Sequence, residues 1–130
     1  MNNGRAFLEA LDERVLVCDG AVGTQIQAAG LSIEDFEGLD GCNEVLNSTR
    51  PDVIHSIHSA YIEAGAEIIE TNTFGSLPWV LDEYGIGSRT RELSLAAARI
   101  ARDAADKSGV FVFGAIGPGT KLGLLGQISF

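Results

Sequence analysis

The fold class follows from one stretch of the sequence, Ala66-Glu67-Ile68-Ile69-Glu70-Thr71-Asn72-Thr73-Phe74. It begins as a short apolar run after Ala64-Gly65, a pair that ends a helix, and it closes in a polar cluster. An apolar run between turn signals predicts a strand that is buried on both faces, as parallel strands are. The polar cluster would then lie at the carboxyl end of this strand, where parallel α/β folds bind their ligands. The alternative is that its hydroxyls and amide only satisfy backbone groups in a turn.

Two further apolar runs have the same character. Residues 15–18 lead into Asp19-Gly20, and residues 110–116 lead into Gly117-Pro118-Gly119. The spacing of apolar residues predicts helices over residues 5–14, 24–29, 49–64 and 88–107, with an irregular acidic stretch at 30–47. In the helix at 49–64, one apolar stripe should face the sheet and leaves out His55 and His58; it consists of Ile54, Ile57, Tyr61 and Ala64. Right-handed crossovers between successive strands then predict three adjacent parallel strands in the order 1-2-3.

Three successive strands that deliver polar or glycine-rich residues to one rim are typical of the catalytic face of a (β/α)₈ barrel. A parallel sheet of three strands has little cover and two bare edges, so it is expected to be part of a larger fold. We therefore predict an α/β fold, an incomplete (β/α)₈ TIM barrel made of its first three parallel strands with their helices. Residues 1–130 would be the N-terminal portion of a barrel domain, truncated after the third strand.

The composition limits the partners of the protein. The 130 residues are 45% apolar and 21% charged, and the net charge is -9. A charge of this sign argues against nucleic acid and anionic membranes, which need a basic surface. No N-terminal signal peptide is evident, and no run approaches the roughly 20 apolar residues of a membrane helix. The expected location is the cytoplasm, and the expected partner is a small molecule.

Four residues at the strand ends are candidates for binding a ligand. Asp19 follows the first expected strand, and Gly20 would allow a ligand to approach the main chain closely. Asn72 and Thr73 follow the second strand and offer an amide and a hydroxyl. For Asp19 the alternative role is to cap the turn that follows it.

The remaining reactive residues give weaker signals. Cys18 falls within an apolar strand and is expected to be inert, whereas Cys42 lies in a polar loop and is expected to be the more exposed. His55 and His58 are expected on the surface, and no third metal ligand is evident near them. No catalytic residue and no metal ligand is assigned within the chain.

One glycine-rich segment approaches a phosphate-binding loop. Gly114-x-x-x-x-Gly119-Thr120-Lys121 differs from the usual pattern because the lysine stands one residue too late. Pro118 also removes an amide from the expected cradle. A phosphate-binding barrel is therefore kept only as a weaker alternative.

Several blocks of the sequence, in order, resemble the start of the homocysteine-binding domain of cobalamin-dependent methionine synthase. The resemblance runs from about Val15 to the C-terminus, and it includes the related betaine– and S-methylmethionine–homocysteine methyltransferases. The blocks are Val17-Cys18-Asp19-Gly20-Ala21-Val22-Gly23-Thr24, Gly41-Cys42-Asn43-Glu44-Val45-Leu46-Asn47, Thr49-Arg50-Pro51-Asp52, Glu63-Ala64-Gly65-Ala66, Glu70-Thr71-Asn72-Thr73-Phe74-Gly75 and Ile116-Gly117-Pro118.

This resemblance implies a barrel in which zinc lowers the pKa of the homocysteine thiol, so that the thiolate accepts a methyl group and methionine forms. Cobalamin and methyltetrahydrofolate would act only through other domains. The zinc cysteines of the family lie in later strands, so Cys18 and Cys42 do not match them. Asp19 and Gly20 inherit a role in holding the amino-acid end of homocysteine, and Asn72 and Thr73 a role in lining the site.

The leading hypothesis is therefore part of a homocysteine S-methyltransferase of the methionine synthase type. The family is enzymatic, and whether the isolated chain has turnover stays open. The alternative is a non-catalytic fragment or a small-molecule binding module without turnover.

Overall fold

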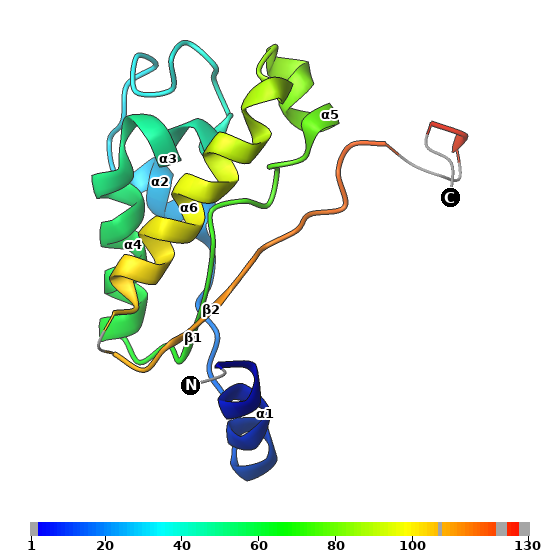
Figure 1. The fold of residues 1–130 in the computed structure, drawn as a ribbon. Coiled ribbons are helices and arrows are strands. Elements are labelled where there is room, and N and C mark those ends of the chain that lie inside the picture. The colour runs from blue at the N-terminus through cyan, green and yellow to red at the C-terminus, as the bar shows by residue number, and fades with distance from the viewer. Residues whose placement is uncertain (1–2, 107, 122–124, 128–130) are drawn as a thin grey trace.

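The computed structural model describes residues 3–106, 108–121 and 125–127 (Figure 1). Its elements, with η for a 3₁₀ turn, are α1 Asn3–Glu13, α2 Val22–Ala28, η1 Asn43–Val45, α3 Leu46–Thr49, α4 Pro51–Glu63, β1 Ile68–Glu70, α5 Pro78–Leu81, η2 Asp82–Tyr84, η3 Gly87–Arg89, α6 Thr90–Ala104 and β2 Phe111–Phe113. The four predicted helices correspond to α1, α2, α4 and α6. Position 107, which the last helix was expected to reach, lies outside the described residues. Within those residues, no helix has the length and apolar character needed to cross a membrane.

The sheet is parallel and has the predicted order. β1 and β2 form a parallel ladder in which Ile68 is paired with Phe111. On the other edge of β1, Cys18 forms one parallel bridge with Ile68. The Asp19 amide also donates a hydrogen bond of 2.9 Å to the Ile68 carbonyl. The chain segments therefore lie in the order 1-2-3, as their sequence order predicted.

The prediction of a buried first strand is wrong. Residues 15–18 pair with β1 only around Cys18, and Val15 and Val17 are 87% and 55% exposed. An apolar run becomes a buried strand only where another layer covers its side chains. In the part of the chain that the structure describes, nothing covers Val15.

The third strand is shorter than the predicted range 110–116. The ladder ends at Phe113, whose carbonyl accepts a hydrogen bond from the Thr71 amide at 2.9 Å. Beyond it, the Ala115 amide donates to the Thr71 hydroxyl at 3.1 Å rather than to a backbone carbonyl. Side-chain bonds therefore replace the ladder at the carboxyl end of the sheet.

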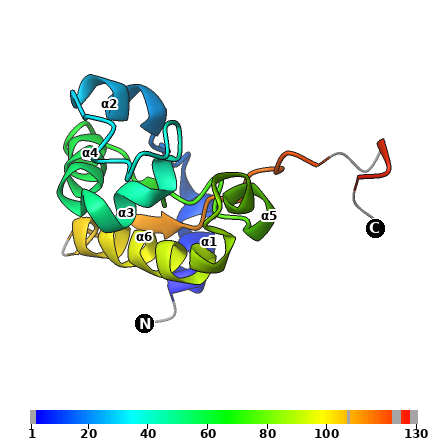
Figure 2. The same cartoon turned by 90° about the horizontal axis from the view of Figure 1, so that it is seen from above.

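α4 and α6 pack against each other, and α6 covers one face of the sheet (Figures 1 and 2). Ala101 and Ala105 pack there against Ala66 and Ile69, and such small side chains let a helix approach a sheet closely. A second cluster joins α2, α3 and α4. Two residues of the predicted α4 stripe, Ile54 and Ile57, belong to this cluster. They pack with Ile26 of α2, Leu46 of α3 and Val53 of α4.

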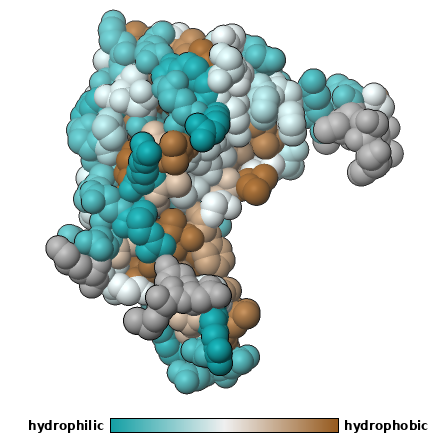
Figure 3. Space-filling view, in the orientation of Figure 1, coloured by the Kyte–Doolittle hydropathy of each residue, from teal (hydrophilic) through white to brown (hydrophobic). Residues whose placement is uncertain are grey.

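α1 lies against the opposite face of β2. The Phe7 ring meets the rings of Phe111 and Phe113 edge-to-face, with centroids 5.3 and 4.9 Å apart. The intervening Val112 packs on the α6 side, as the alternation of side chains along a strand requires. Leu8 of α1 is 62% exposed, and hydrophobic surface is visible next to this helix in Figure 3.

Candidate functional site

Hydrogen bonds connect the residues that follow the three parallel segments. The Asp19 carboxylate accepts the Glu70 amide at 3.0 Å, which joins the first segment to the end of β1. The Gly117 amide donates to the Phe74 carbonyl at 3.0 Å, which joins the loop after β1 to the loop after β2. The strand ends therefore form one continuous rim.

Asp19 is partly buried at this rim, and its ionisation is perturbed. Burial is the main reason that the pKa of Asp19 is raised above its ordinary value. The hydrogen bond from the Glu70 amide opposes the rise, and the neighbouring Glu70 carboxylate adds to it. A cation beside Asp19 would offset both the cost of burying its carboxylate and the repulsion from Glu70.

A cavity of about 270 Å³ opens at the rim. Its lining comes from all three parallel segments and from η1, and includes Gly20, Asn43, Glu44, Glu70, Thr71, Asn72, Phe74 and Ala115. A Cβ atom at Gly20 would lie 3.2 Å from the Tyr61 hydroxyl, so the glycine lets this residue pack closely against Tyr61. Two carboxylates in the lining favour a ligand that carries a positive group.

Asn72 is buried beside the cavity and is held by its neighbours. Its Nδ2 donates to the Asn43 carbonyl at 2.9 Å and to Asn47 Oδ1 at 3.0 Å. Asn47 Nδ2 donates in return to the Asn72 carbonyl at 2.8 Å. Asn72 therefore supports the wall of the cavity from a fixed orientation.

Thr73 lies on the other side of the loop. It lines a separate cavity of about 320 Å³, together with Ser76, Ser94 and Ala98. Its hydroxyl donates to the Ala115 carbonyl at 2.7 Å and lies 2.6 Å from the Thr71 hydroxyl. The structure thus brings Gly20 and Asn72 to one cavity, with Asp19 at the same rim. Thr73 lines the other cavity instead.

Two polar residues that we did not single out are also buried here. Glu44 lines the cavity, and its Oε1 accepts the Gly75 amide at 2.7 Å. Asn47, one helical turn further along, forms the reciprocal pair with Asn72. Both residues flank the buried Val45-Leu46 pair. Polar residues directly beside an apolar pair were the one feature of the sequence that could have indicated them.

The predictions for three other side chains need correction. Cys42 is fully buried with Val45, Leu81 and Leu93, and Cys18 is the exposed cysteine. Burial raises the pKa of the Cys42 thiol. His58 is fully buried rather than on the surface, neither of its ring nitrogens has a hydrogen-bond partner, and burial lowers its pKa to about 4.

The described residues do not fit a zinc ion. Structural and catalytic zinc sites use three or four Cys, His, Asp or Glu ligands. Among residues 3–106, 108–121 and 125–127, no three such side chains come close enough to hold a metal. His55 Nε2 lies 3.4 Å from the Asp103 carboxylate, with no third ligand described beside this pair. Burial of the Cys42 thiol disfavours the thiolate form that binds zinc.

The glycine-rich segment after β2 is arranged poorly for phosphate. The Gly117 amide is bonded to the Phe74 carbonyl, and Pro118 has none to offer. The Thr120 hydroxyl donates to the Glu83 carboxylate, which would repel an anion. These contacts disfavour the phosphate-binding alternative.

The fold and the rim define a parallel α/β protein with an acidic cavity at its strand ends. The sequence model of the family described as homocysteine S-methyltransferase matches residues 16–129, and the chain belongs to this family.

Similar proteins agree with this assignment. The chain is 52% identical over 129 residues to the methionine synthase of Mycobacterium tuberculosis (strain ATCC 25618 / H37Rv) and 50% identical over 129 residues to that of Mycobacterium leprae (strain TN). Each match covers 95% of this chain, which spans 11% of the length of either relative.

Two crystal structures of the homocysteine methyltransferase MmuM from Escherichia coli have the same fold over 90% of this chain. The oxidised form aligns with a TM-score of 0.68, 23% identity and 41% of its own chain covered. The metallated form aligns with a TM-score of 0.69, 24% identity and 42% covered. At this identity the likeness establishes the fold alone.

Proposed function

We propose that this chain is part of a homocysteine S-methyltransferase of the methionine synthase type and holds the amino-acid end of homocysteine. The observation that carries the proposal is the cavity at the strand ends. Gly20 and Asn72 line it, the acidic residues Glu44 and Glu70 make its wall negative, and it lies in a chain whose residues 16–129 match the family.

The substrate-binding roles follow from the chemistry of an amino acid. Its ammonium group would lie against Asp19, whose raised pKa reflects burial that a cation would offset. Gly20 would admit the amino acid to the main chain, because it carries no side chain to fill the cavity. Asn72 would complete the wall of the cavity. Thr73 would support that wall indirectly, through its hydrogen bond to the carbonyl of the lining residue Ala115.

Further elements of the proposal concern the rest of the protein. The exposed apolar residues Leu8, Val15 and Ile116 support a domain in which further strands cover this sheet, as in a barrel. Zinc would be held by residues other than those described, and cobalamin and methyltetrahydrofolate would belong to other domains. The net charge of -9 supports a cytoplasmic enzyme that acts on a small molecule.

Methyl transfer by a complete barrel that contains residues 16–129 unchanged tests the proposal. We expect methionine to form from homocysteine and a methylated cobalamin, and we expect homocysteine alone to raise the melting temperature. Homocysteine binding without transfer from any methyl donor would favour a binding module instead. No binding of homocysteine would refute the proposed function.

A further inference from the structure

A short segment of the chain clamps the loop that follows β1. Asn43 and Asn47 hold the Asn72 side chain and carbonyl through three hydrogen bonds of 2.8 to 3.0 Å. Glu44 holds the same loop three residues further on, at the Gly75 amide. These bonds join residues that lie 25 to 31 positions apart in the sequence.

The bond of Glu44 is the strongest candidate for a functional role in this clamp. The residue is only 9% exposed, although it also lines the cavity. Its Oε1 lies 2.7 Å from the Gly75 nitrogen, a short distance that is typical of a charge-assisted hydrogen bond. An acceptor of this kind is costly to remove, because the amide is then left without a partner.

Gly75, on the other side of the contact, packs directly against the Glu44 carboxylate. A Cβ atom at position 75 would lie 2.7 Å from Glu44 Oε1 and 3.1 Å from its carboxyl carbon. Gly75 does not have a positive φ, and the atoms that its Cβ would meet are those of the Glu44 carboxylate, so a side chain here would displace that carboxylate. Glu44 and Gly75 therefore form a matched pair that sets where the loop containing Asn72 and Phe74 runs.

We propose that Glu44 is a positioning residue for the amino-acid pocket. It acts through the Gly75 amide and fixes the loop that presents Asn72 and Phe74 to the cavity. Its carboxylate does not itself contact the substrate. This role rests on the proposed function, since it concerns the same pocket, and it separates Glu44 from Asp19, which we expect to meet the substrate ammonium.

Four variants of a complete barrel that contains residues 16–129 unchanged test this role. Glu44→Ala removes the acceptor, and Glu44→Gln removes the charge but keeps an oxygen for the Gly75 amide. Gly75→Ala displaces the carboxylate from the opposite side. Glu63→Ala, at the exposed end of α4, is the matched control for the loss of a carboxylate.

The expected readout is the KM for homocysteine compared with kcat. Losing a hydrogen bond to a charged group corresponds to about a tenfold change or more, so Glu44→Ala and Gly75→Ala should each raise KM by about tenfold. Because the pocket holds the end of the substrate away from the thiol, kcat should change by less than about threefold. Glu44→Gln should stay within about threefold of the parent KM, and the control should match the parent.

Each other outcome has a definite meaning. An unchanged KM in Glu44→Ala overturns the positioning role. A Glu44→Gln variant as weak as Glu44→Ala also overturns it, because the carboxylate would then contact the substrate ammonium directly. If Glu44→Ala does not fold, Gly75→Ala alone decides, since it breaks the same contact. If the unchanged barrel does not use homocysteine, the proposed function fails, and the positioning role fails with it.

Discussion

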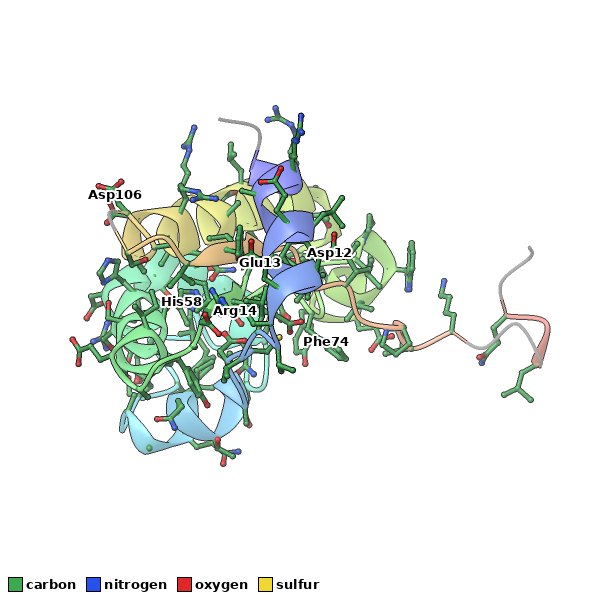
Figure 4. All side chains as sticks on the ribbon, turned by 90° about the horizontal axis from the view of Figure 1, so that it is seen from below. Asp12, Glu13, Arg14, His58, Phe74 and Asp106 are labelled. Carbon is green, nitrogen blue, oxygen red and sulfur yellow. The ribbon has the colours of Figure 1, made fainter. Side chains whose placement is uncertain are left out.

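Acid should destabilise this fold through a single histidine. His58 lies within α4, is fully buried, and has no hydrogen-bond partner at either ring nitrogen (Figure 4). Burial, with a smaller contribution from His55, lowers its pKa from 6.5 to about 4. The folded chain therefore keeps His58 neutral at a pH where the unfolded chain protonates it. The associated stability is complete above pH 6.5 and is lost as the pH falls toward 4.

The size of the effect follows from that difference in pKa. Each pKa unit corresponds to about 1.4 kcal/mol, so the full loss is about 3 kcal/mol, and about 2 kcal/mol of it falls between pH 7.5 and pH 5. The carboxylates whose pKa values are lowered, those of Asp35, Asp52, Glu67 and Glu92, titrate below this interval. The raised pKa of Asp19 acts in the opposite direction and does not depend on His58, so the difference between the parent and a His58 variant isolates the histidine.

Urea unfolding followed by circular dichroism at the two pH values measures the effect. His58→Leu replaces the ring with an apolar group of similar size, so it should remove most of the loss between pH 7.5 and pH 5. His55→Gln is the control and should keep the loss, because His55 is partly exposed and faces Asp103. The same pH dependence in the parent chain and in His58→Leu would refute the reasoning.

Three further predictions concern the rim. In a complete barrel, Asp19→Asn should weaken homocysteine binding by roughly 1.5–3 kcal/mol with little change in kcat, and unchanged affinity would mean that the ammonium binds elsewhere. Gly117→Ala should lower the melting temperature, because a Cβ atom would lie 2.5 Å from the Phe74 carbonyl oxygen; an unchanged melting temperature would contradict this crowding. Asn47→Ala should reduce the free energy of unfolding by about 2–4 kcal/mol, since two buried Asn72 groups lose a partner, and a loss below about 0.5 kcal/mol would refute it.

The sheet order and the rim could be predicted because they depend on local signals. An apolar run followed by polar residues marks a strand and its carboxyl end, and right-handed crossovers then give the order of Cys18, Ile68 and Phe111. The side of the loop on which Thr73 falls could not be predicted. It depends on hydrogen bonds with Thr71 and Ala115 that form only when the two strand ends meet.

Burial was less predictable than order, for a physical reason. The α4 stripe was expected to exclude His58, but the helix contacts several elements at once and so buries a wider face than one stripe. Cys42 was expected to be exposed because its neighbours in sequence are polar. Its core partners Leu81 and Leu93 are distant in sequence, and no local pattern indicates them.

The parallel sheet also has a consequence for how quickly this chain can fold. Val17 and Glu67 must meet across 50 residues, and Thr71 and Ala115 across 44. Closing such long loops costs conformational entropy before any ladder bond compensates it, which slows folding. The backbone hydrogen bonds within α4 and α6 are local, so these helices can form early. The sheet, and with it the rim at its strand ends, is therefore expected to close last, on a scaffold of helices that is already in place.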